Sequence, residues 1–183
     1  IYDKEKGIIF LSRDRFGEKP LFYTLQNNIF AFSSELKAFR HHPGLSMNLS
    51  DIGLQKYCAH GYFPGDHTPY KEAYKLPAGC NLFLSIDRGR LEVKRYWSYK
   101  VEPEHGESKT IEKKWSEEIH SLLEKSVQRR LIADVPLGVF LSGGLDSSIV
   151  AYFASSHLTS RKLKTFSIGF DDHTFDETKW AQK

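Results

Sequence analysis

The sequence predicts a mixed fold, in which an antiparallel sheet of α+β type is followed by a βαβ unit of α/β type. Short β-branched and aromatic runs separated by turn residues occur throughout residues 1–100. Residues 101–110 are rich in Glu, Pro, His, Gly, Ser and Lys and lack apolar periodicity, as linkers do. In residues 111–183 a helical period is followed by strand, glycine loop, helix and strand. The 183 residues therefore form two parts joined by a linker at 101–110.

In the first part, the runs at 8–12, 21–25 and 29–33 predict one small antiparallel sheet. Gln26, Asn27 and Asn28 tolerate turn geometry, so the last two runs form a hairpin. The remaining elements predicted here are a short helix at 34–39, a helix capped by Ser50 or Asp51 that runs to Cys58, and a hairpin of strands 81–86 and 90–97.

In the second part, apolar residues recur every three or four positions over 111–131, which predicts an amphipathic helix of about six turns. The wholly apolar run at 137–141 is typical of a parallel strand buried on both faces. A helix follows over 145–158, then a second buried strand at 165–170, and a further helix begins near 175–181.

Composition excludes several classes of function. Lys and Arg number 26 against 23 Asp and Glu, with no run of five basic residues, so the charge pattern of a nucleic-acid binder is missing. No stretch approaches the roughly 18 apolar residues of a membrane span, and no signal peptide opens the chain, so a cytoplasmic protein is expected. Cys58, Cys80 and the eight histidines have no metal-ligand or disulfide spacing. Packing roles are expected for Trp97, Trp115 and Trp180.

The loop after the first predicted parallel strand carries the chemistry. It reads Ser142-Gly143-Gly144-Leu145-Asp146-Ser147-Ser148 and opens a helix, whose first N–H groups lack intrahelical partners and favour an anion. The two glycines allow a phosphate to approach the backbone, and the three serines add hydroxyl donors. A carboxylate beside a phosphate needs an intervening cation, so Asp146 indicates Mg²⁺.

Other glycine motifs do not fit this loop. A Walker A loop needs a Lys after its glycines, a nucleophile elbow needs Gly two residues before and after its Ser, and the dinucleotide spacing also fails. A purely structural Gly-Gly turn is the alternative reading, but such a turn requires neither three serines nor an acid.

The loop resembles the PP-loop signature Ser-Gly-Gly-x-Asp-Ser of ATP pyrophosphatases. Its flanks narrow the resemblance to the glutamine-hydrolysing asparagine synthetases, whose order of motifs covers the whole chain. The matching segments are 12–23, 33–39, 76–79, 95–97, 130–148, 166–170 and 175–177. The resemblance implies that residues 1–100 are the rear of an Ntn-type glutaminase domain and that residues 111–183 are the front of a PP-loop synthetase domain.

The resemblance also implies a mechanism. In this family glutamine is hydrolysed in one domain and ammonia reaches the other, where ATP and Mg²⁺ convert aspartate to β-aspartyl-AMP, which ammonia attacks to give asparagine, AMP and pyrophosphate. Carried over, Ser142, Gly143, Gly144, Leu145, Asp146, Ser147 and Ser148 would hold the pyrophosphate part of ATP, with Asp146 catalytic and metal-linked. Leu141 and Ile168 match nucleotide-contacting positions, although core packing would explain them equally well.

The glutaminase nucleophile of the family is an N-terminal cysteine, and neither Cys58 nor Cys80 matches it. No glutaminase residue is therefore assigned, a homodimer is left open, and the 183 residues alone are expected to be inactive and marginally folded. A charged cluster is expected to be solvated and to form surface salt bridges, with a role at an interdomain face as the alternative. It comprises Arg13, Asp14, Arg15, Glu18, Lys19 and Glu35.

Three further functions stay open at this point. A relative of the family could amidate another carboxylate, as β-lactam synthetases and sugar-amidating enzymes do. An RNA-modifying PP-loop protein is disfavoured by the small net charge of +3. A non-catalytic domain could keep the loop for nucleotide sensing.

Overall fold

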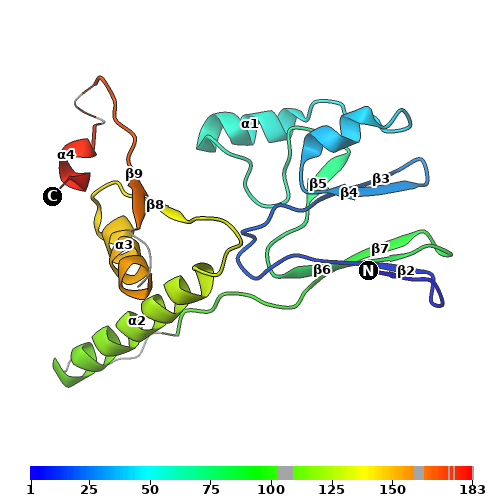
Figure 1. Cartoon of the computed structure of the whole chain (residues 1–183). Coiled ribbons are helices and arrows are strands. Elements are labelled where there is room, and N and C mark those ends of the chain that lie inside the picture. Colours follow the sequence, from blue (N-terminus) through cyan, green and yellow to red (C-terminus); the bar gives the residue numbers. More distant parts are fainter. Residues whose placement is uncertain (103–108, 159–162, 173, 175, 183) are drawn as a thin grey trace. The chain divides into compact units, whose positions relative to one another are not determined.

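The computed structural model describes residues 1–102, 109–158, 163–172, 174 and 176–182. The chain divides into two compact units, Ile1–Glu102 and Pro103–Lys183 (Figure 1). Antiparallel sheets make up most of the first unit, and the second contains a parallel strand pair with helices, so the predicted mixed α/β class is confirmed. Most of the linker predicted at 101–110 lies outside the described residues, and helix α2 (Lys109–Arg130) begins within that range.

Two antiparallel sheets form the first unit. One has the strand order β1-β2-β6-β7 and the other β4-β3-β5. The first comprises β1 (Tyr2–Asp3), β2 (Ile8–Ser12), β6 (Cys80–Ser85) and β7 (Arg90–Arg95), and the second comprises β3 (Phe22–Gln26), β4 (Ile29–Ser33) and β5 (Ala73–Lys75). The predicted hairpins β3–β4 and β6–β7 are both present.

The prediction that 8–12, 21–25 and 29–33 share one sheet is wrong. Strand β2 pairs with the distant β6, with Leu11 opposite Leu82, whereas β3 pairs with β4 and β5. Strand propensity identifies each run, but it cannot choose between partners that are far apart in the sequence. Burial of the core favours the observed pairing of β2 with β6, because the core is covered only when the inward faces of two separate sheets pack against each other.

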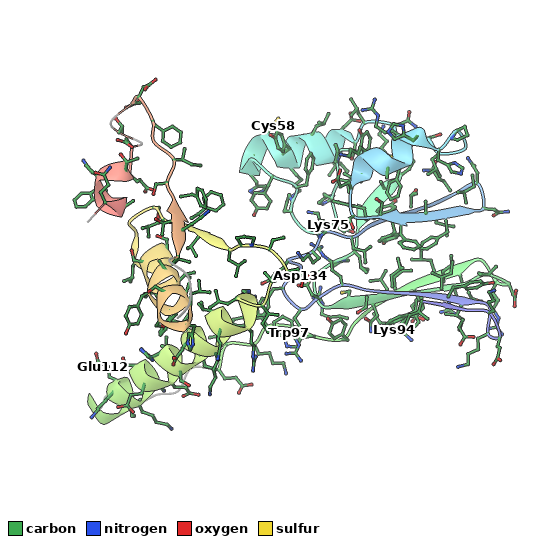
Figure 2. All side chains as sticks on the ribbon, viewed as in Figure 1. Cys58, Lys75, Lys94, Trp97, Glu112 and Asp134 are labelled. Carbon is green, nitrogen blue, oxygen red and sulfur yellow. The ribbon has the colours of Figure 1, made fainter. Side chains whose placement is uncertain are left out.

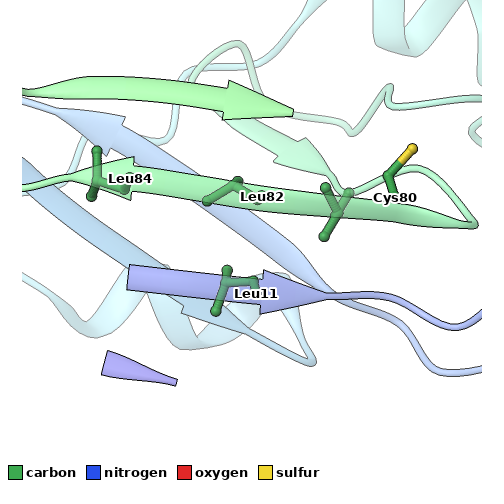
Figure 3. Packing of buried hydrophobic residues seen from close by; sticks show 5 residues of the cluster. Leu11, Cys80, Leu82 and Leu84 are labelled. Carbon is green, nitrogen blue, oxygen red and sulfur yellow. The ribbon is translucent and has the colours of Figure 1, made fainter. Parts of the chain in front are cut away.

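The core of the first unit lies between the two sheets. Strand β6 alternates buried and half-buried residues, so that Cys80, Leu82 and Leu84 point inward together with Leu11 of β2 (Figure 3). Leu76 completes the buried cluster, and Tyr23 and Phe30 of the other sheet pack against it. This alternation with period two is what a sheet with one buried face requires.

Two short helical segments complete this unit. A 3₁₀ helix, η1 (Leu36–His41), occupies the position where a short helix was predicted at 34–39, displaced toward the C-terminus. Helix α1 (Asp51–His60) is capped as expected, because the Ser50 side chain accepts a hydrogen bond from the Gly53 N–H at 3.1 Å. It ends at Gly61, whose φ of 75° is the left-handed conformation typical of a helix C-terminus.

The second unit contains the predicted βαβ arrangement. Strand β8 (Gly138–Phe140) and strand β9 (Lys164–Phe166) pair in parallel, with Val139 opposite Thr165. Helix α3 (Leu145–His157) connects them in sequence, and α4 (Thr178–Ala181) is a single turn near the end. Val127 of α2 and Phe153 and Ala154 of α3 form a small core, against which Val139 packs.

The expectation that both parallel strands are buried is wrong. Phe140 is 76% exposed, Phe166 is 54% exposed, and every residue of β9 is exposed. Helices α2 and α3 pack on the strand pair through Val139, and within the described residues the rings of Phe140 and Phe166 have no such cover. The second strand is also shorter than the predicted 165–170, so Ile168 lies beyond its end.

The three tryptophans differ in their packing. Trp97 packs edge-on against Phe16, with ring centroids 4.9 Å apart, whereas Trp115 and Trp180 are substantially exposed. Among the described residues, no helix combines the length and the apolar composition that crossing a bilayer demands.

Candidate functional site

The predicted loop leaves the carboxyl end of β8 and enters α3. Pairing with β9 continues one residue past the strand, because the Leu141 N–H donates to the Phe166 carbonyl at 2.8 Å. The Ser167 hydroxyl then donates to the Leu141 carbonyl at 2.6 Å. These two bonds fix the point at which the loop departs, at the sheet edge where open α/β folds bind ligands.

Two serine hydroxyls hold the loop together. The Oγ atoms of Ser142 and Ser147 lie 3.0 Å apart, and Ser147 Oγ also donates to the Gly144 carbonyl at 3.1 Å. The Gly144 N–H in turn donates to Ser142 Oγ at 3.3 Å. The hydroxyl of Ser142 is exposed, and each hydroxyl can rotate its proton toward an incoming anion.

The N-terminus of α3 faces this loop without a capping side chain. Gly144 is the N-cap residue and supplies no side-chain hydrogen bond, and its carbonyl accepts from the Ser148 N–H at 3.1 Å. The first-turn N–H groups of Leu145, Asp146 and Ser147 therefore point out of the helix end, where an anion is favoured. Asp146 in this first turn is exposed, as Leu145 and Ser148 are.

Gly143 is the tightest point of the loop. Its φ is 80°, and a Cβ added there would lie 2.5 Å from the backbone carbonyl carbon of Trp180. Only glycine combines this conformation with such an approach. Helix α4 is thus seated directly on the loop through Gly143.

A cavity of about 380 Å³ opens beside the loop. Of the residues predicted from the sequence, Leu141, Ser142, Ser147 and Ile168 line it, whereas Gly143, Gly144, Leu145, Asp146 and Ser148 lie in the loop and first helical turn outside its lining. Its other lining residues, which sequence reasoning did not assign, are Phe140, Phe166, Ser167, Phe170 and Glu177. All five lie in segments 130–148, 166–170 and 175–177, which carry the family resemblance, so the resemblance is the sequence signal that could have found them. Phe175 lies outside the described residues.

Asp146 is the residue whose chemistry suits a magnesium ion. No group of three or more His, Cys, Asp or Glu side chains in the described part of the chain could form a metal cage. Mg²⁺ that accompanies a nucleotide needs only one or two protein carboxylates, because phosphates and water supply its other ligands. A single exposed carboxylate in the first turn of α3, whose N-terminal end favours an anion, fits that requirement.

Both cysteines lie in the first unit, and neither is a candidate nucleophile. Cys58 is exposed on α1 and Cys80 is buried in the core (Figures 2 and 3). Both thiols are free, and neither lies at a described cavity.

The charged cluster of the first unit was expected to form surface salt bridges, but its members Arg13 and Asp14 bond mainly to backbone groups. The Arg13 guanidinium donates to three backbone carbonyls, those of Lys19 at 2.9 Å, Leu76 at 2.6 Å and Gly17 at 2.7 Å. It therefore ties the loop after β2 to the segment before β6. Of the predicted surface ion pairs, Glu35 forms one with Lys37 at 2.7 Å, and this bond raises the pKa of Lys37.

Asp14 organises the same loop. Its carboxylate accepts from the backbone N–H groups of Glu18 at 2.9 Å and Lys19 at 3.1 Å. These bonds favour the ionised form and lower the pKa of Asp14 below its ordinary value. Backbone groups, more than opposite charges, thus satisfy the two charged residues Arg13 and Asp14.

Comparison with known proteins gives two family matches and a set of relatives. The glutamine amidotransferase domain family matches residues 1–97, and the asparagine synthase family matches residues 118–183. A putative glutamine-hydrolysing asparagine synthetase 2 of Methanocaldococcus jannaschii is 40% identical over 185 residues, covering 100% of this chain and 35% of the relative. The glutamine-hydrolysing asparagine synthetase 3 of Bacillus subtilis is 32% identical, covering 94% of this chain and 28% of the relative.

Similarity also extends to a protein with another name. Amidase chry2 of Gibberella zeae is 28% identical over 197 residues, which cover 100% of this chain and 28% of that protein. The chain spans about a third or less of the length of these relatives. Since the first match covers more than half of the chain, the chain belongs to the glutamine amidotransferase domain family, and the residues that follow are similar to the asparagine synthase family.

Proposed function

We propose that the protein carrying these residues is a glutamine-dependent asparagine synthetase, which amidates aspartate at the expense of ATP. In this proposal residues 1–100 are part of an Ntn-type glutaminase domain and residues 111–183 begin a PP-loop synthetase domain. The observation that carries the proposal is the serine-bridged glycine loop at the α3 N-terminus, which adjoins a cavity at the carboxyl ends of β8 and β9.

The loop would bind the phosphates of ATP. The N–H groups of the first turn of α3 favour an anion, and the hydroxyls of Ser142 and Ser147 lie within reach of each other at 3.0 Å, so one phosphate could accept from both. The first-turn N–H groups and the hydroxyls would then stabilise the charge that accumulates on pyrophosphate as it leaves.

Asp146 would hold the Mg²⁺ of the nucleotide. When bound, this ion neutralises phosphate charge and so removes the repulsion between the carboxylate and the nucleotide. The exposed position of Asp146 in the first turn of α3 leaves room for the waters that Mg²⁺ keeps.

The proposed reaction has two balanced steps. A β-carboxylate oxygen of aspartate attacks the α-phosphorus of ATP, the bond from that phosphorus to the bridging oxygen breaks, and pyrophosphate leaves. Ammonia then attacks the acyl carbon, AMP leaves with the former carboxylate oxygen, and the nitrogen loses its extra proton. The cavity beside Ser142 and Ser147, at about 380 Å³, has the size of a small-molecule site and would hold the nucleoside.

Product analysis tests this function. The complete gene product, supplied with glutamine, aspartate and ATP, is expected to form asparagine, AMP and pyrophosphate in equal amounts. Formation of ADP and phosphate would contradict cleavage between the α and β phosphates. One similar protein, amidase chry2, carries a name other than asparagine synthetase, so amidation of a different carboxylic acid is kept as the alternative. It would be supported if other carboxylic acids drive AMP formation where aspartate does not.

A further inference from the structure

Glu177 lines the cavity but has no part in the proposed chemistry. It comes from the segment just before α4, and it is exposed. Its role concerns recognition of the nucleotide and therefore rests on the proposed function.

The segment that bears Glu177 is fixed from two sides. Helix α4 is seated on Gly143, whose added Cβ would lie 2.6 Å from the Ala181 nitrogen. A Cβ on Gly169 would lie 3.2 Å from Cγ2 of Thr178. The glycine loop and the segment after β9 thus both contact α4, at residues directly after Glu177.

Hydrogen bonds fix the local backbone as well. The Asp176 carboxylate accepts from the Thr178 hydroxyl at 2.8 Å, and the Glu177 carbonyl accepts from the Trp180 N–H at 2.9 Å. The backbone of Glu177 is therefore set before any ligand enters.

The cavity has a polar side and an aromatic side. Ser142 and Ser147 belong to the loop, whereas Phe140, Phe166 and Phe170 contribute rings, two of them with centroids 6.4 Å apart. Phosphates suit the loop, and a purine suits the rings, since bases stack on aromatic side chains. The ribose of a nucleotide bound in this way lies between the two sides.

Charge decides which part of the nucleotide Glu177 can contact. Unless a cation lies between them, a carboxylate repels phosphates, and it can only accept hydrogen bonds, so a direct contact of Glu177 with the nucleotide needs a neutral group with donors. ATP offers these at the ribose hydroxyls and at the adenine amino group. Helix α4 contacts Gly143 of the loop at Trp180, one helical turn after Glu177, and the Glu177 carbonyl accepts from the Trp180 N–H. The backbone at Glu177 therefore lies close to the loop, and this position favours the ribose over the adenine amino group.

We propose that Glu177 is a specificity-determining residue of the nucleotide site, whose carboxylate accepts hydrogen bonds from the ribose hydroxyls of ATP. The same chemistry serves in dinucleotide-binding folds, where an acidic residue binds a ribose hydroxyl. Glu177 would thereby select ribonucleotides over nucleotides that lack these hydroxyls.

The test compares ATP with 2′,3′-dideoxy-ATP on the complete gene product, with calorimetry to measure the dissociation constants. Wild-type protein is expected to bind ATP at least about tenfold more tightly than the dideoxy analogue, the range for hydrogen bonds to a charged group. Glu177→Ala is expected to weaken the binding of ATP by a similar factor and to leave the binding of the analogue unchanged. The affinity of Glu177→Gln for ATP is expected to lie between those of the wild type and Glu177→Ala. Glu117→Gln, an exposed change on α2, is the matched control.

Three results would overturn the proposal. The first is equal affinity of the wild type for ATP and the dideoxy analogue, and the second is an equal loss of affinity for both nucleotides in Glu177→Ala. The third concerns purine riboside triphosphate, which lacks the amino group. If Glu177→Ala does not weaken binding of this nucleotide, Glu177 contacts the amino group and not the ribose. Pyrophosphate exchange separates this proposal from the proposed function. If the protein catalyses aspartate-dependent pyrophosphate exchange but Glu177 does not discriminate between ATP and the dideoxy analogue, only the role of Glu177 is contradicted. If Glu177 discriminates between the two nucleotides but no aspartate-dependent exchange occurs, only the proposed function is contradicted.

Discussion

The Ser167 hydroxyl donates to the Leu141 carbonyl at 2.6 Å, across the gap where strands β8 and β9 have already ended. A side chain thus extends the parallel pairing to Leu141, the residue before the glycine loop. Because Leu141 precedes Ser142, this bond sets the direction in which the loop leaves the sheet.

Replacing Ser167 with Ala is expected to lower stability by about 1 kcal/mol and to weaken ATP binding several-fold, since the Leu141 carbonyl loses its partner. Urea unfolding and calorimetry on the complete gene product measure the two effects. Ser156→Ala is the matched control, because the Ser156 hydroxyl donates to the Phe153 carbonyl at 2.8 Å inside α3. Equal effects on ATP binding in both variants would contradict a special role for Ser167.

Gly143→Ala is expected to displace α4 from its contact with the glycine loop. The new methyl group would lie 2.5 Å from backbone of Trp180, and the φ of 80° alone costs an alanine about 1–2 kcal/mol. Gly89→Ala is the control, because Gly89 also has a positive φ, of 58°, but no atom lies within 4 Å of the added Cβ. This variant therefore measures the effect of backbone strain without the contact with α4. Pyrophosphate exchange should be lost in the first variant and retained in the second. Retention in both would show that the contact with α4 is dispensable.

Arg13→Lys is expected to destabilise the first unit by roughly 1–2 kcal/mol despite conserving the charge. Lysine cannot reproduce the planar fork that donates to the carbonyls of Lys19, Leu76 and Gly17. Urea unfolding measures the change, with the neighbouring exposed Arg15→Lys as control. A loss no larger than that of the control would mean that the carbonyl contacts contribute little.

Asp14 should give stability an acid-dependent component. Its pKa is lowered in the folded state by the Glu18 and Lys19 N–H groups, so its contribution is present above the ordinary carboxyl pKa and is lost as pH falls through the lowered value. Asp14→Asn is therefore expected to be less stable than wild type near about pH 6, with the difference shrinking toward about pH 2. Unfolding at both pH values, with the exposed Asp134→Asn as control, measures this, and a difference independent of pH would contradict it (Figure 2).

Local patterns in the sequence predicted the helices, both hairpins and the parallel strand pair, because period and turn residues are local signals. The partner of β2 was beyond reach, since Leu11 pairs with Leu82 across the chain. Burial of β8 and β9 was also mispredicted, because an apolar run such as Val139–Phe140 reports the preference of a strand and not what covers it.

The site was partly predictable for the same reason. Ser142 and Ser147 stand in one short motif, and the structure joins their hydroxyls at 3.0 Å. Ser167 and Glu177 reach the cavity from other segments, so only the fold brings them to the loop. The proposed Mg²⁺ role of Asp146 stays a prediction, as does the assignment of Ile168 to the nucleotide.

Aspartate-dependent exchange of labelled pyrophosphate into ATP tests the central claim most directly, because exchange requires reversible cleavage between the α and β phosphates at the loop. The complete gene product should catalyse this exchange with aspartate and Mg²⁺ present, and Asp146→Asn should reduce it at least about a hundredfold, an expected cost when a residue holding charge at the reacting centre is lost. Exchange that survives Asp146→Asn undiminished would contradict the account.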